Sequence, residues 1–417
     1  MINKLRYLTA FSVAFLGFAT TNTYACGFQI LEQGASNLGT AVAGAGANAN
    51  NDASAAYWNI ASAVYSNLNI GETRIDISAN LIIPSLSLDA SESSNYLGES
   101  FGTIENCAPI TPLPNMFVLH RFSEDFYGGL SVTVPYGLST DYPESWGGRH
   151  MAITSYLMSI DFNPSVCYKV NDWLSVGCGI SAQYFYAKLT QDRPITNQRI
   201  RLTADSWSVG GNIGFAVNYA KDGRFAFAWR SSVSQELSGN GTMGNINAPV
   251  STVIDTPHTF NISWYQRLWG KLNNFAVMAD YTYTMWSLFE NLDIKSPVFA
   301  SYRYENWKDT SRISFGMHYY PDFNEKLVLR IGTAFDETPI RSYEYRTARI
   351  PCADRLWLTC GFGYVFNEKI SMDFGYQYLF FIGNTNVDEV PTTPYANVKG
   401  HYFGNNQTVA LQISLKF

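Results

Sequence analysis

The dominant pattern along the chain is an alternation of period two between large apolar and small polar residues, which is typical of β-strands. From Trp207 to Tyr219, the odd positions are mostly Trp, Val, Ile, Phe and Tyr, whereas the even positions are Ser, Gly, Asn and Ala. The stretches 225–230, 327–336 and 370–378 alternate in the same way. Each predicted strand therefore has one large apolar face and one small face that is rich in Gly.

The small polar face distinguishes between two possible all-β architectures, a soluble sandwich and a transmembrane barrel. A soluble sandwich also alternates, but its outward face is charged and its inward face is large. A transmembrane barrel turns apolar side chains to lipid and polar ones to its lumen, and its closure satisfies every backbone group. We therefore predict an all-β fold, a transmembrane antiparallel β-barrel. The alternating runs after Leu68 number about fourteen, an even number, as in single-chain bacterial barrels.

Turns and loops separate the predicted strands. Short polar turns, which we expect on the periplasmic side, lie at 171–172, 221–223, 270–271, 324–325 and 367–368. Longer polar connections, which we expect to be extracellular loops, lie at 142–150, 239–253 and 384–404. The last strand is expected over 408–417. Its terminal Phe417 resembles the signal by which the barrel-assembly machinery recognises outer-membrane barrels.

The first 25 residues are predicted to be a secretory signal peptide. Lys4 and Arg6 precede an apolar run over 8–18, and small residues follow it. The run is too short to cross a hydrocarbon core of ~30 Å, and no run of about 18 apolar residues follows. Cleavage would make Cys26 the first mature residue. A short membrane anchor is the alternative for the signal, and lipidation is an alternative fate of Cys26.

Residues 26–66 do not alternate and are rich in Gly, Ala, Asn and Ser. Such small residues suit compact turns and short helices better than a lipid-facing strand. We predict a signal peptide over 1–25, an N-terminal hatch, or plug, inside the barrel over 26–66, and the barrel over 67–417. A disordered periplasmic tail is the alternative for 26–66.

Composition excludes several classes of protein. Charged residues make up 15% of the 417 residues and aromatic residues another 15%, whereas ordinary soluble domains have about 25% charged residues. The formal net charge is −6, which argues against a nucleic-acid binder because phosphate contacts need clustered Lys and Arg. The aromatic and β-branched content excludes a disordered chain.

The candidate chemistry is sparse. Six cysteines in an exported chain suggest disulfides, and we consider Cys352 with Cys360 and Cys26 with Cys107 among the possible pairings. No zinc-ligand spacing, nucleophile elbow or phosphate loop occurs. We therefore expect no catalytic residues, no metal and no cofactor.

Several short motifs occur in a fixed order along the chain: Gly27-Phe28-Gln29, Asn59-Ile60-Ala61, and the stretches 134–142, 146–149, 163–177, 305–309, 335–339 and 349–355. On these motifs, residues 26–417 resemble the FadL-type long-chain fatty acid transport family of Gram-negative outer membranes, which also includes aromatic-hydrocarbon transporters. The resemblance implies a fourteen-stranded barrel with an N-terminal hatch, located in the outer membrane.

The resemblance also implies a route. A long-chain fatty acid or other hydrophobic small molecule enters a pocket from outside and leaves sideways, by passive diffusion, through a gap at a kinked third strand into the lipid of the outer membrane. The closed barrel is expected to be monomeric. Phe28, Asn59 and Ala61 match positions of the hatch and ligand pocket.

The residues at the expected kink fit a broken strand. Pro135 has no N–H for the ladder and Gly137 weakens it, so we expect a local break from Val134 onward. A simple strand end at the membrane rim is the alternative. Val134 stands where some relatives carry a polar residue, and Ile60 replaces the Pro of the hatch motif. Fewer polar contacts suit a neutral hydrophobic ligand.

Four charged residues are candidates for the ligand carboxylate or the lumen. Arg193 and Arg303 lie in segments where relatives place basic residues around a ligand carboxylate, and ordinary loop charge is the alternative. Arg330 and Asp336 fall on the inward face of their strand, where a charged pair would tether the hatch or lie hydrated in the lumen. A general porin for small solutes, a transporter of aromatic hydrocarbons, and a surface enzyme or adhesin are the competing functions.

Overall fold

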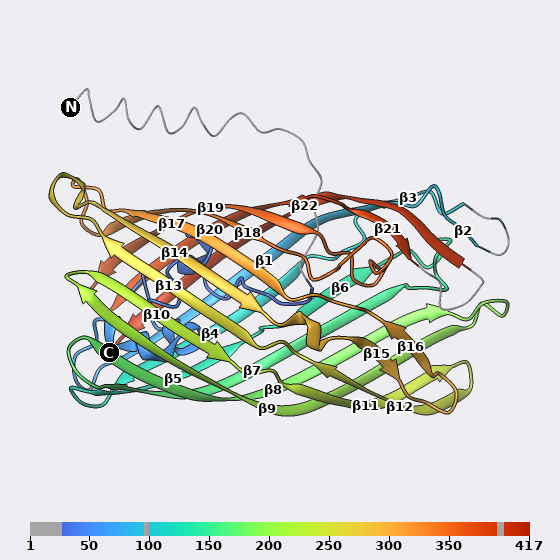
Figure 1. The fold of residues 1–417 in the computed structure, drawn as a ribbon, viewed down its shortest axis with the longest axis horizontal. Coiled ribbons are helices and arrows are strands. Elements are labelled where there is room, and N and C mark those ends of the chain that lie inside the picture. The colour runs from blue at the N-terminus through green and yellow to red at the C-terminus, as the bar shows by residue number, and fades with distance from the viewer. Residues whose placement is uncertain (1–26, 96–97, 99, 390–395) are drawn as a thin grey trace, which may run out of the picture.

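The computed structural model describes residues 27–95, 98, 100–389 and 396–417; the predicted signal peptide and Cys26 lie outside these residues. In Figure 1 the strands tilt around a long barrel. The barrel closes because β1 (Thr73–Asp89) pairs antiparallel with both the last strand, β22 (Ala396–Lys416), and the second wall strand, β4 (Thr111–Arg121).

The wall within the described part of the chain has fourteen strands, as predicted, three of which are interrupted. Besides β1, β4 and β22, the continuous strands are β7 (Thr154–Lys169), β8 (Leu174–Asp192), β9 (Arg199–Ala220), β14 (Phe275–Thr284), β17 (Thr310–Tyr319), β18 (Leu327–Asp336), β19 (Asp354–Asn367) and β20 (Ile370–Ile382). The interrupted strands are β5 (Phe126–Thr133) with β6 (Gly137–Asp141), β10 (Gly223–Arg230) with β11 (Ser234–Met243), and β12 (Ile246–Asp255) with β13 (Thr259–Arg267).

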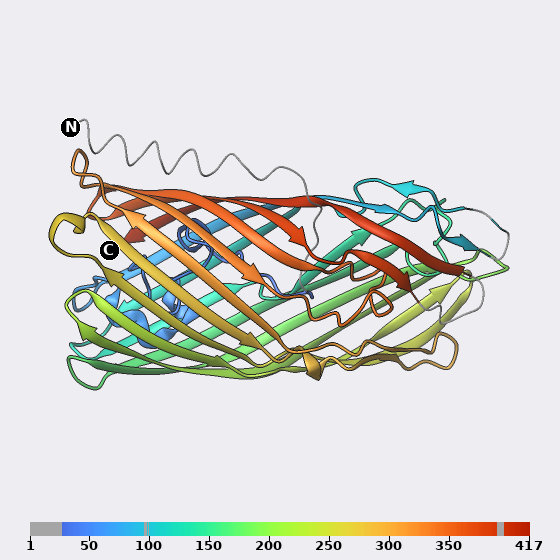
Figure 2. The same ribbon diagram turned by 45° about the horizontal axis from the view of Figure 1, so that its top comes forward.

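Short elements lie beyond the ends of the wall strands. They are β2 (Ser94–Asn95), β3 (Thr103–Ile104), β15 (Asn291–Ile294), β16 (Ser301–Tyr304), β21 (Asn386–Glu389), η2 (Gly270–Leu272) and η3 (Trp286–Leu288). Figure 2 shows that most of them gather at the end of the barrel opposite the C-terminus.

The two faces of the wall follow the predicted alternation. In β9, Trp207, Val209 and Ile213 are 62%, 71% and 53% exposed, as expected for side chains that face lipid. On β20, Asp373 and Gln377 are buried toward the lumen. The apolar side chains therefore face outward and the polar ones inward.

Residues 27–66 lie inside the barrel at the end where the chain terminates (Figures 1 and 2). They form α2 (Ala35–Leu38), α3 (Ala55–Trp58) and η1 (Ile60–Tyr65), joined by turns, and almost all of them are buried. No helix in the described residues is both long and apolar enough to cross a membrane.

Glycines on the lumen face make room for the hatch. A Cβ at Gly332 would lie 2.2 Å from the carbonyl carbon of Thr40, and one at Gly177 would lie 2.6 Å from the side chain of Ile60. At these positions only a residue without a side chain lets the hatch backbone approach the wall so closely.

Arginines of the wall bind carbonyl oxygens of the hatch. The hatch has little regular structure, so many of its carbonyl groups have no backbone partner, and a buried carbonyl group without a partner is destabilising. Wall guanidinium groups donate to five hatch carbonyls: Arg74 to Asn51 (3.1 Å), Arg224 to Ala47 (3.4 Å) and Asn48 (2.8 Å), Arg230 to Tyr57 (2.9 Å) and Arg312 to Ala41 (2.7 Å). Of these carbonyls, that of Asn48 also accepts from the backbone amide of Asn51.

Two predicted loops were wrong. Residues 239–253 belong to the β11–β12 hairpin, and much of 384–404 belongs to β21 and β22, with 390–395 outside the described residues. The last strand begins at Ala396 rather than at position 408. Wall strands that project beyond the bilayer have water outside, so polar residues occur on both faces and the alternation disappears.

The fit between Gly332 and the hatch can be tested by substitution. Gly332→Val should displace the hatch, because overpacking against backbone atoms costs about 1–3 kcal/mol or more. Proteolysis of the purified protein should then cut within residues 34–66 about tenfold faster or more than in the unsubstituted protein. Gly211→Val is the matched control, since its Cβ would meet only the carbonyl oxygen of Gly179, at 3.5 Å. Equal cleavage of both variants would contradict the fit.

Candidate functional site

The wall is open beside the break between β5 and β6. β4 pairs with β5 over Met116–Arg121, and β7 pairs with both β5 and β6. β6 has no ladder with β4 among the described residues, so the stretch 111–115 of β4 pairs on one side only, with β1. The strand is interrupted between Thr133 and Gly137, and β4 and β6 are not paired with each other in the described residues.

Proline shapes the open edge on the side of β4. Pro112 and Pro114 lie in the part of β4 that faces the opening and carry no N–H groups. Proline occurs in sheets mainly on such edges, because it cannot donate to a ladder. The sequence of β4 therefore agrees with a wall strand that pairs with β1 on one side and has no partner on the side of β6.

An apolar cavity of about 270 Å³ passes through the opening. Its lining includes Tyr156, Leu157 and Met158, three consecutive residues of β7. Successive side chains of a strand point to opposite faces, so the cavity reaches from the lumen side of the wall to its lipid side. Much of the remaining lining is aliphatic and comes from the hatch, from β1, β4 and β6, and from the break itself: Ile30, Ile82, Leu86, Leu113, Leu138 and Val134.

The N-terminal end of the hatch pairs with the broken strand from inside. The amide of Ile30 donates to the carbonyl of Pro135 (2.9 Å), and the amide of Gly137 donates to the carbonyl of Phe28 (2.8 Å). The side-chain amide of Gln33 donates to the carbonyl of Val134 (2.9 Å). The hatch therefore supplies hydrogen-bond partners to the backbone of the break.

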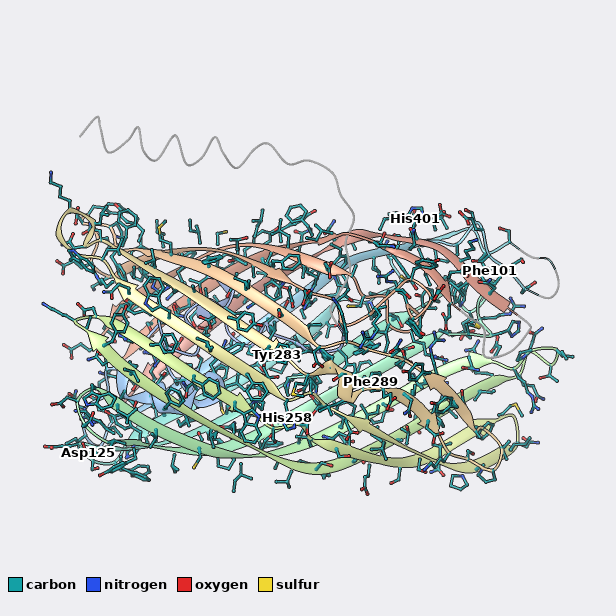
Figure 3. All side chains as sticks on the ribbon, in the orientation of Figure 1. Phe101, Asp125, His258, Tyr283, Phe289 and His401 are labelled. Carbon is teal, nitrogen blue, oxygen red and sulfur yellow. The ribbon has the colours of Figure 1, made fainter. Side chains whose placement is uncertain are left out.

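Phe28 occupies an aromatic cluster behind this pairing. Its ring centroid lies 4.7 Å from that of Trp286, 5.5 Å from Phe289, 5.7 Å from Trp307 and 5.9 Å from Tyr136. Figure 3 shows Phe289 between Asp125 at one end of the barrel and Phe101 near the other. Sequence reasoning gave no role to Trp286, Phe289 or Trp307; the available signal was their occurrence in and around a stretch without strand alternation.

Asn59 and Ala61 lie elsewhere in the hatch. The side chain of Asn59 donates to the carbonyls of Phe215 and Phe227 (3.3 Å each), and the carbonyl of Ala61 accepts from Ser175 Oγ (2.7 Å). These contacts attach the hatch to β8, β9 and β10. Asn59 and Ala61 are thus brought to the wall, while Phe28 alone of the three contacts the break.

The inward-facing charges have partners other than each other. Arg330 and Asp336 are both buried, as expected for the lumen face. Arg330 pairs with Asp373 (2.7 Å), and Asp336 pairs with Arg355, which lines the cavity. Arg330 also lies against Gly39 of the hatch.

The two loop arginines differ in their surroundings. Arg193 is exposed, and Met243 Sδ lies 3.9 Å from its guanidinium group. Arg303 forms ion pairs with Glu389 (2.6 Å) and Glu305 (3.5 Å). Neither arginine lines the cavity.

Arg349 lies in the loop between β18 and β19, and sequence reasoning gave it no role. Its neighbours Ile350 and Pro351 line the cavity, and its guanidinium group donates only to neutral acceptors: the Thr154 carbonyl (3.3 Å), Ser155 Oγ (3.0 Å) and Gln191 Oε1 (2.6 Å). It forms no ion pair within the described part of the chain. Burial, the largest cause, lowers the pKa of Arg349 to about 10 although Glu389 opposes the shift, so the group stays charged at neutral pH. The 349–355 motif was the available signal.

The predicted cysteine pairings do not form where the structure describes them. Cys360 is exposed on the outer face of β19, whereas Cys352 is buried among loop residues. Cys107 is buried without a disulfide to any described residue, and Cys26 lies outside those residues. Among the residues that the structure describes, no group of His, Cys, Asp and Glu side chains could hold a metal ion.

Comparison with known proteins gives a family match over most of the chain. The family model described as "Outer membrane protein transport protein (OMPP1/FadL/TodX)" matches residues 16–417. The chain is 29% identical over 417 residues to the long-chain fatty acid transport protein of Escherichia coli O6:H1, covering 89% of this chain and 90% of that relative.

Solved structures share the fold. A Pseudomonas aeruginosa FadL homologue superposes with a TM-score of 0.82 at 21% identity, covering 93% of this chain and 99% of the other. The toluene transporter TodX of Pseudomonas putida superposes with a TM-score of 0.70 at 12% identity and the same coverage.

The buried Glu305 in the loop after β16 predicts a dependence of stability on pH. Burial, with Glu389 adding to it, raises the pKa of Glu305 to about 7 against the opposing effect of Arg303. Between about pH 4.5 and 7 the native state therefore keeps this proton, whereas the unfolded chain releases it. The contribution of Glu305 to the free energy of unfolding is fully present below about pH 4.5 and is lost as the pH rises through about 7. Glu305→Gln should stabilise this loop by up to about 3 kcal/mol at pH 8 and by almost nothing at pH 4.

Hydrogen exchange of the amides over 301–309, at both pH values, measures this effect. Glu290→Gln, at an exposed position, is the control and should change exchange at neither pH. A larger stabilisation at pH 4 than at pH 8 would refute the assignment of the raised pKa.

Proposed function

Because the chain belongs to the OMPP1/FadL/TodX family of outer membrane transport proteins, we propose that it carries long-chain fatty acids or similar hydrophobic molecules sideways into the bilayer by passive diffusion. The family transports hydrophobic compounds across the outer membrane of Gram-negative bacteria and is not a family of enzymes. The identity of the ligand and the side exit are the parts that we propose.

One observation carries the proposal: the apolar cavity is lined by consecutive residues of β7 on both faces of the wall. A ligand in this cavity would contact aliphatic side chains on the lumen side and lipid on the other. Moving a hydrocarbon chain into water costs ~0.8 kcal/mol per CH₂. A side exit avoids this cost, whereas a water-filled pore through the hatch would impose it.

The filled lumen weighs against a general porin. Almost all hatch residues are buried against the wall, and the hatch is attached at several strands by the arginine contacts described above. Among the described residues, the hatch thus occupies lumen space that a porin would leave to small polar solutes. A hydrophobic ligand needs only to displace Phe28 and the adjoining N-terminal residues, which lie between the aromatic cluster and the break.

Arg349 favours a fatty acid over a neutral ligand. It is a cation at the extracellular side of the cavity whose hydrogen bonds go only to neutral groups, so a carboxylate can bind it without breaking an ion pair. Arg303 would first have to break its ion pairs with Glu305 and Glu389. The exposed Arg193 stays a candidate for the first contact with the ligand. The curated relative with 29% identity is named a long-chain fatty acid transport protein.

Aromatic hydrocarbons are the second candidate. The rings around Phe28 form a cluster that would accept another flat aromatic molecule in place of the phenylalanine ring. The relative TodX is named a toluene transporter. This candidate predicts a ligand that needs no cation.

Blocking the opening tests the side exit. Gly137→Leu should reduce oleate uptake by cells about tenfold, because Gly137 lines the cavity and a Cβ added to it would lie 2.7 Å from the side chain of Ile30, so the new side chain would obstruct the opening. Gly211→Leu, on the lipid face of β9, is the control and should transport normally at equal surface expression. Normal uptake by the Gly137→Leu variant would remove the side exit from the mechanism.

Arg349→Gln tests the choice of ligand. Hydrogen bonds to charged groups contribute about 1.5–3 kcal/mol, so oleate binding to the purified protein should weaken about tenfold or more, while toluene binding stays unchanged. Arg341→Gln, at an exposed position of the same loop, should bind both ligands normally. Equal losses for both ligands, or unchanged oleate binding, would contradict carboxylate recognition by Arg349.

A further inference from the structure

A buried carboxyl group lines the cavity at the side opening. Glu32 lies between Ile30 and Gln33, which both hydrogen-bond to the break. It is 4% exposed and belongs to the lining of the cavity. Its Oε2 accepts a hydrogen bond from the backbone amide of Leu31 (3.0 Å), and it forms no ion pair within the described part of the chain. Burying an ionised group is unfavourable unless the group is paired, so packing does not account for a glutamate at this position.

The cations that face Glu32 have other partners. Arg312 acts on Glu32 electrostatically, but its guanidinium group donates to the carbonyl of Ala41 (2.7 Å). Arg355 is the other charged residue in the described lining of the cavity, and it pairs with Asp336. A carboxyl group has two oxygens that can accept several hydrogen bonds. Glu32 therefore faces the cavity with the capacity for a further hydrogen bond, which a ligand can supply.

The lipid side of the opening is apolar. Met158, Ile160 and Phe162 follow one another on the outer face of β7, and the first two line the cavity. Phe162 is 39% exposed. A carboxylate that left the cavity here would enter hydrocarbon in its ionised form, which is far more costly than transfer of the neutral acid. A fatty acid therefore needs a proton before its head group leaves the protein.

Glu32 lies where such a proton can be held. Ile350, which follows Arg349 in the chain, lines the same cavity of about 270 Å³ as Glu32 and Met158. A head group that moves from Arg349 to the lipid therefore stays within this cavity. Two carboxyl groups at hydrogen-bond distance cannot both ionise readily, so they hold one proton between them. We propose, on the basis of the proposed transport of fatty acids, that the ligand carboxylate shares a proton with Glu32 and leaves through the opening as the neutral acid.

The proton is conserved in this step. The ligand arrives as a carboxylate, and one proton from water joins the hydrogen-bonded pair that it forms with Glu32. The ligand then takes this proton into the bilayer as the carboxylic acid, and Glu32 returns to the state in which it met the ligand. No covalent bond to the protein forms. A neutral hydrocarbon does not need the step, so Glu32 acts as a positioning residue for acids only.

Uptake at two pH values tests the proton step. Glu32→Gln keeps the size of the side chain and can donate to a carboxylate, but it cannot share an acid proton. In cells that display the unsubstituted protein, uptake of radiolabelled oleate should be several-fold faster at about pH 6 than at about pH 8, because the shared proton is bound more often at the lower pH. In the Glu32→Gln variant, uptake at about pH 6 should be about tenfold slower and should change little with pH.

Two variants and one ligand serve as controls at equal surface expression. Oleyl alcohol has the same chain length as oleate and no carboxyl group, so its uptake should be equal in all variants and at both pH values. Glu344→Gln, at an exposed loop position, should transport oleate like the unsubstituted protein. Glu32→Asp keeps a carboxyl group and should keep the dependence on pH.

Two results would overturn the proposal. Equal losses of oleate and oleyl alcohol uptake in the Glu32→Gln variant would indicate a packing role for the side chain. An unchanged pH dependence of oleate uptake in this variant would show that Glu32 does not hold the proton. Failure of the proposed function is distinguishable from both, because the unsubstituted protein would then take up no oleate at either pH.

Discussion

The close approach of the hatch to the inner wall is the constraint on which the rest of the structure depends. The lumen of a fourteen-stranded barrel would be a polar channel if its inward side chains were of ordinary size. Here Gly177 and Gly332 leave space that Ile60 and the backbone of Thr40 fill. The hatch can therefore be irregular in conformation and still be packed at the density of a protein interior.

Close packing brings the carbonyl groups of the hatch out of water, and the wall arginines satisfy some of them. Arg224 and Arg312 contact aromatic rings as well as hatch carbonyls, since Arg224 lies over Tyr65 (4.3 Å) and Arg312 over Trp357 (4.6 Å). The same side chains thus supply hydrogen bonds and packing. The N-terminal residues differ, because they bind the break through backbone pairing and one aromatic ring. We infer that movement during transport is confined to this end of the hatch.

The fold could be predicted from the sequence wherever one face of a strand touches lipid. Trp207 and Ile213 alternate with small residues because the two faces of β9 meet different environments. The prediction failed for 239–253 and 384–404, where water lies outside the wall and the two faces no longer differ in polarity. The break at Pro135 was predictable because proline and glycine limit a ladder by their own chemistry.

The site was less predictable, because its partners come from distant parts of the chain. Inward orientation of Arg330 and Asp336 followed from alternation, yet their partners, Asp373 and Arg355, depend on the register between strands. Arg349 lies in a loop whose path no periodicity describes. The pairing of Ile30 with Pro135 joins residues far apart in sequence, and only the folded barrel brings them together.

The two prolines of β4 affect how its free edge can pair with strands of other proteins in the membrane. A wall strand that is unpaired on one side is a template to which a strand of another molecule can add. In hydrocarbon, each free backbone N–H group favours such pairing, because no water is present to accept its hydrogen bond. Pro112 and Pro114 remove donors from this edge, so it recruits foreign strands poorly. The barrel wall can thus contain an opening without promoting intermolecular pairing between its free strand edge and strands of neighbouring proteins.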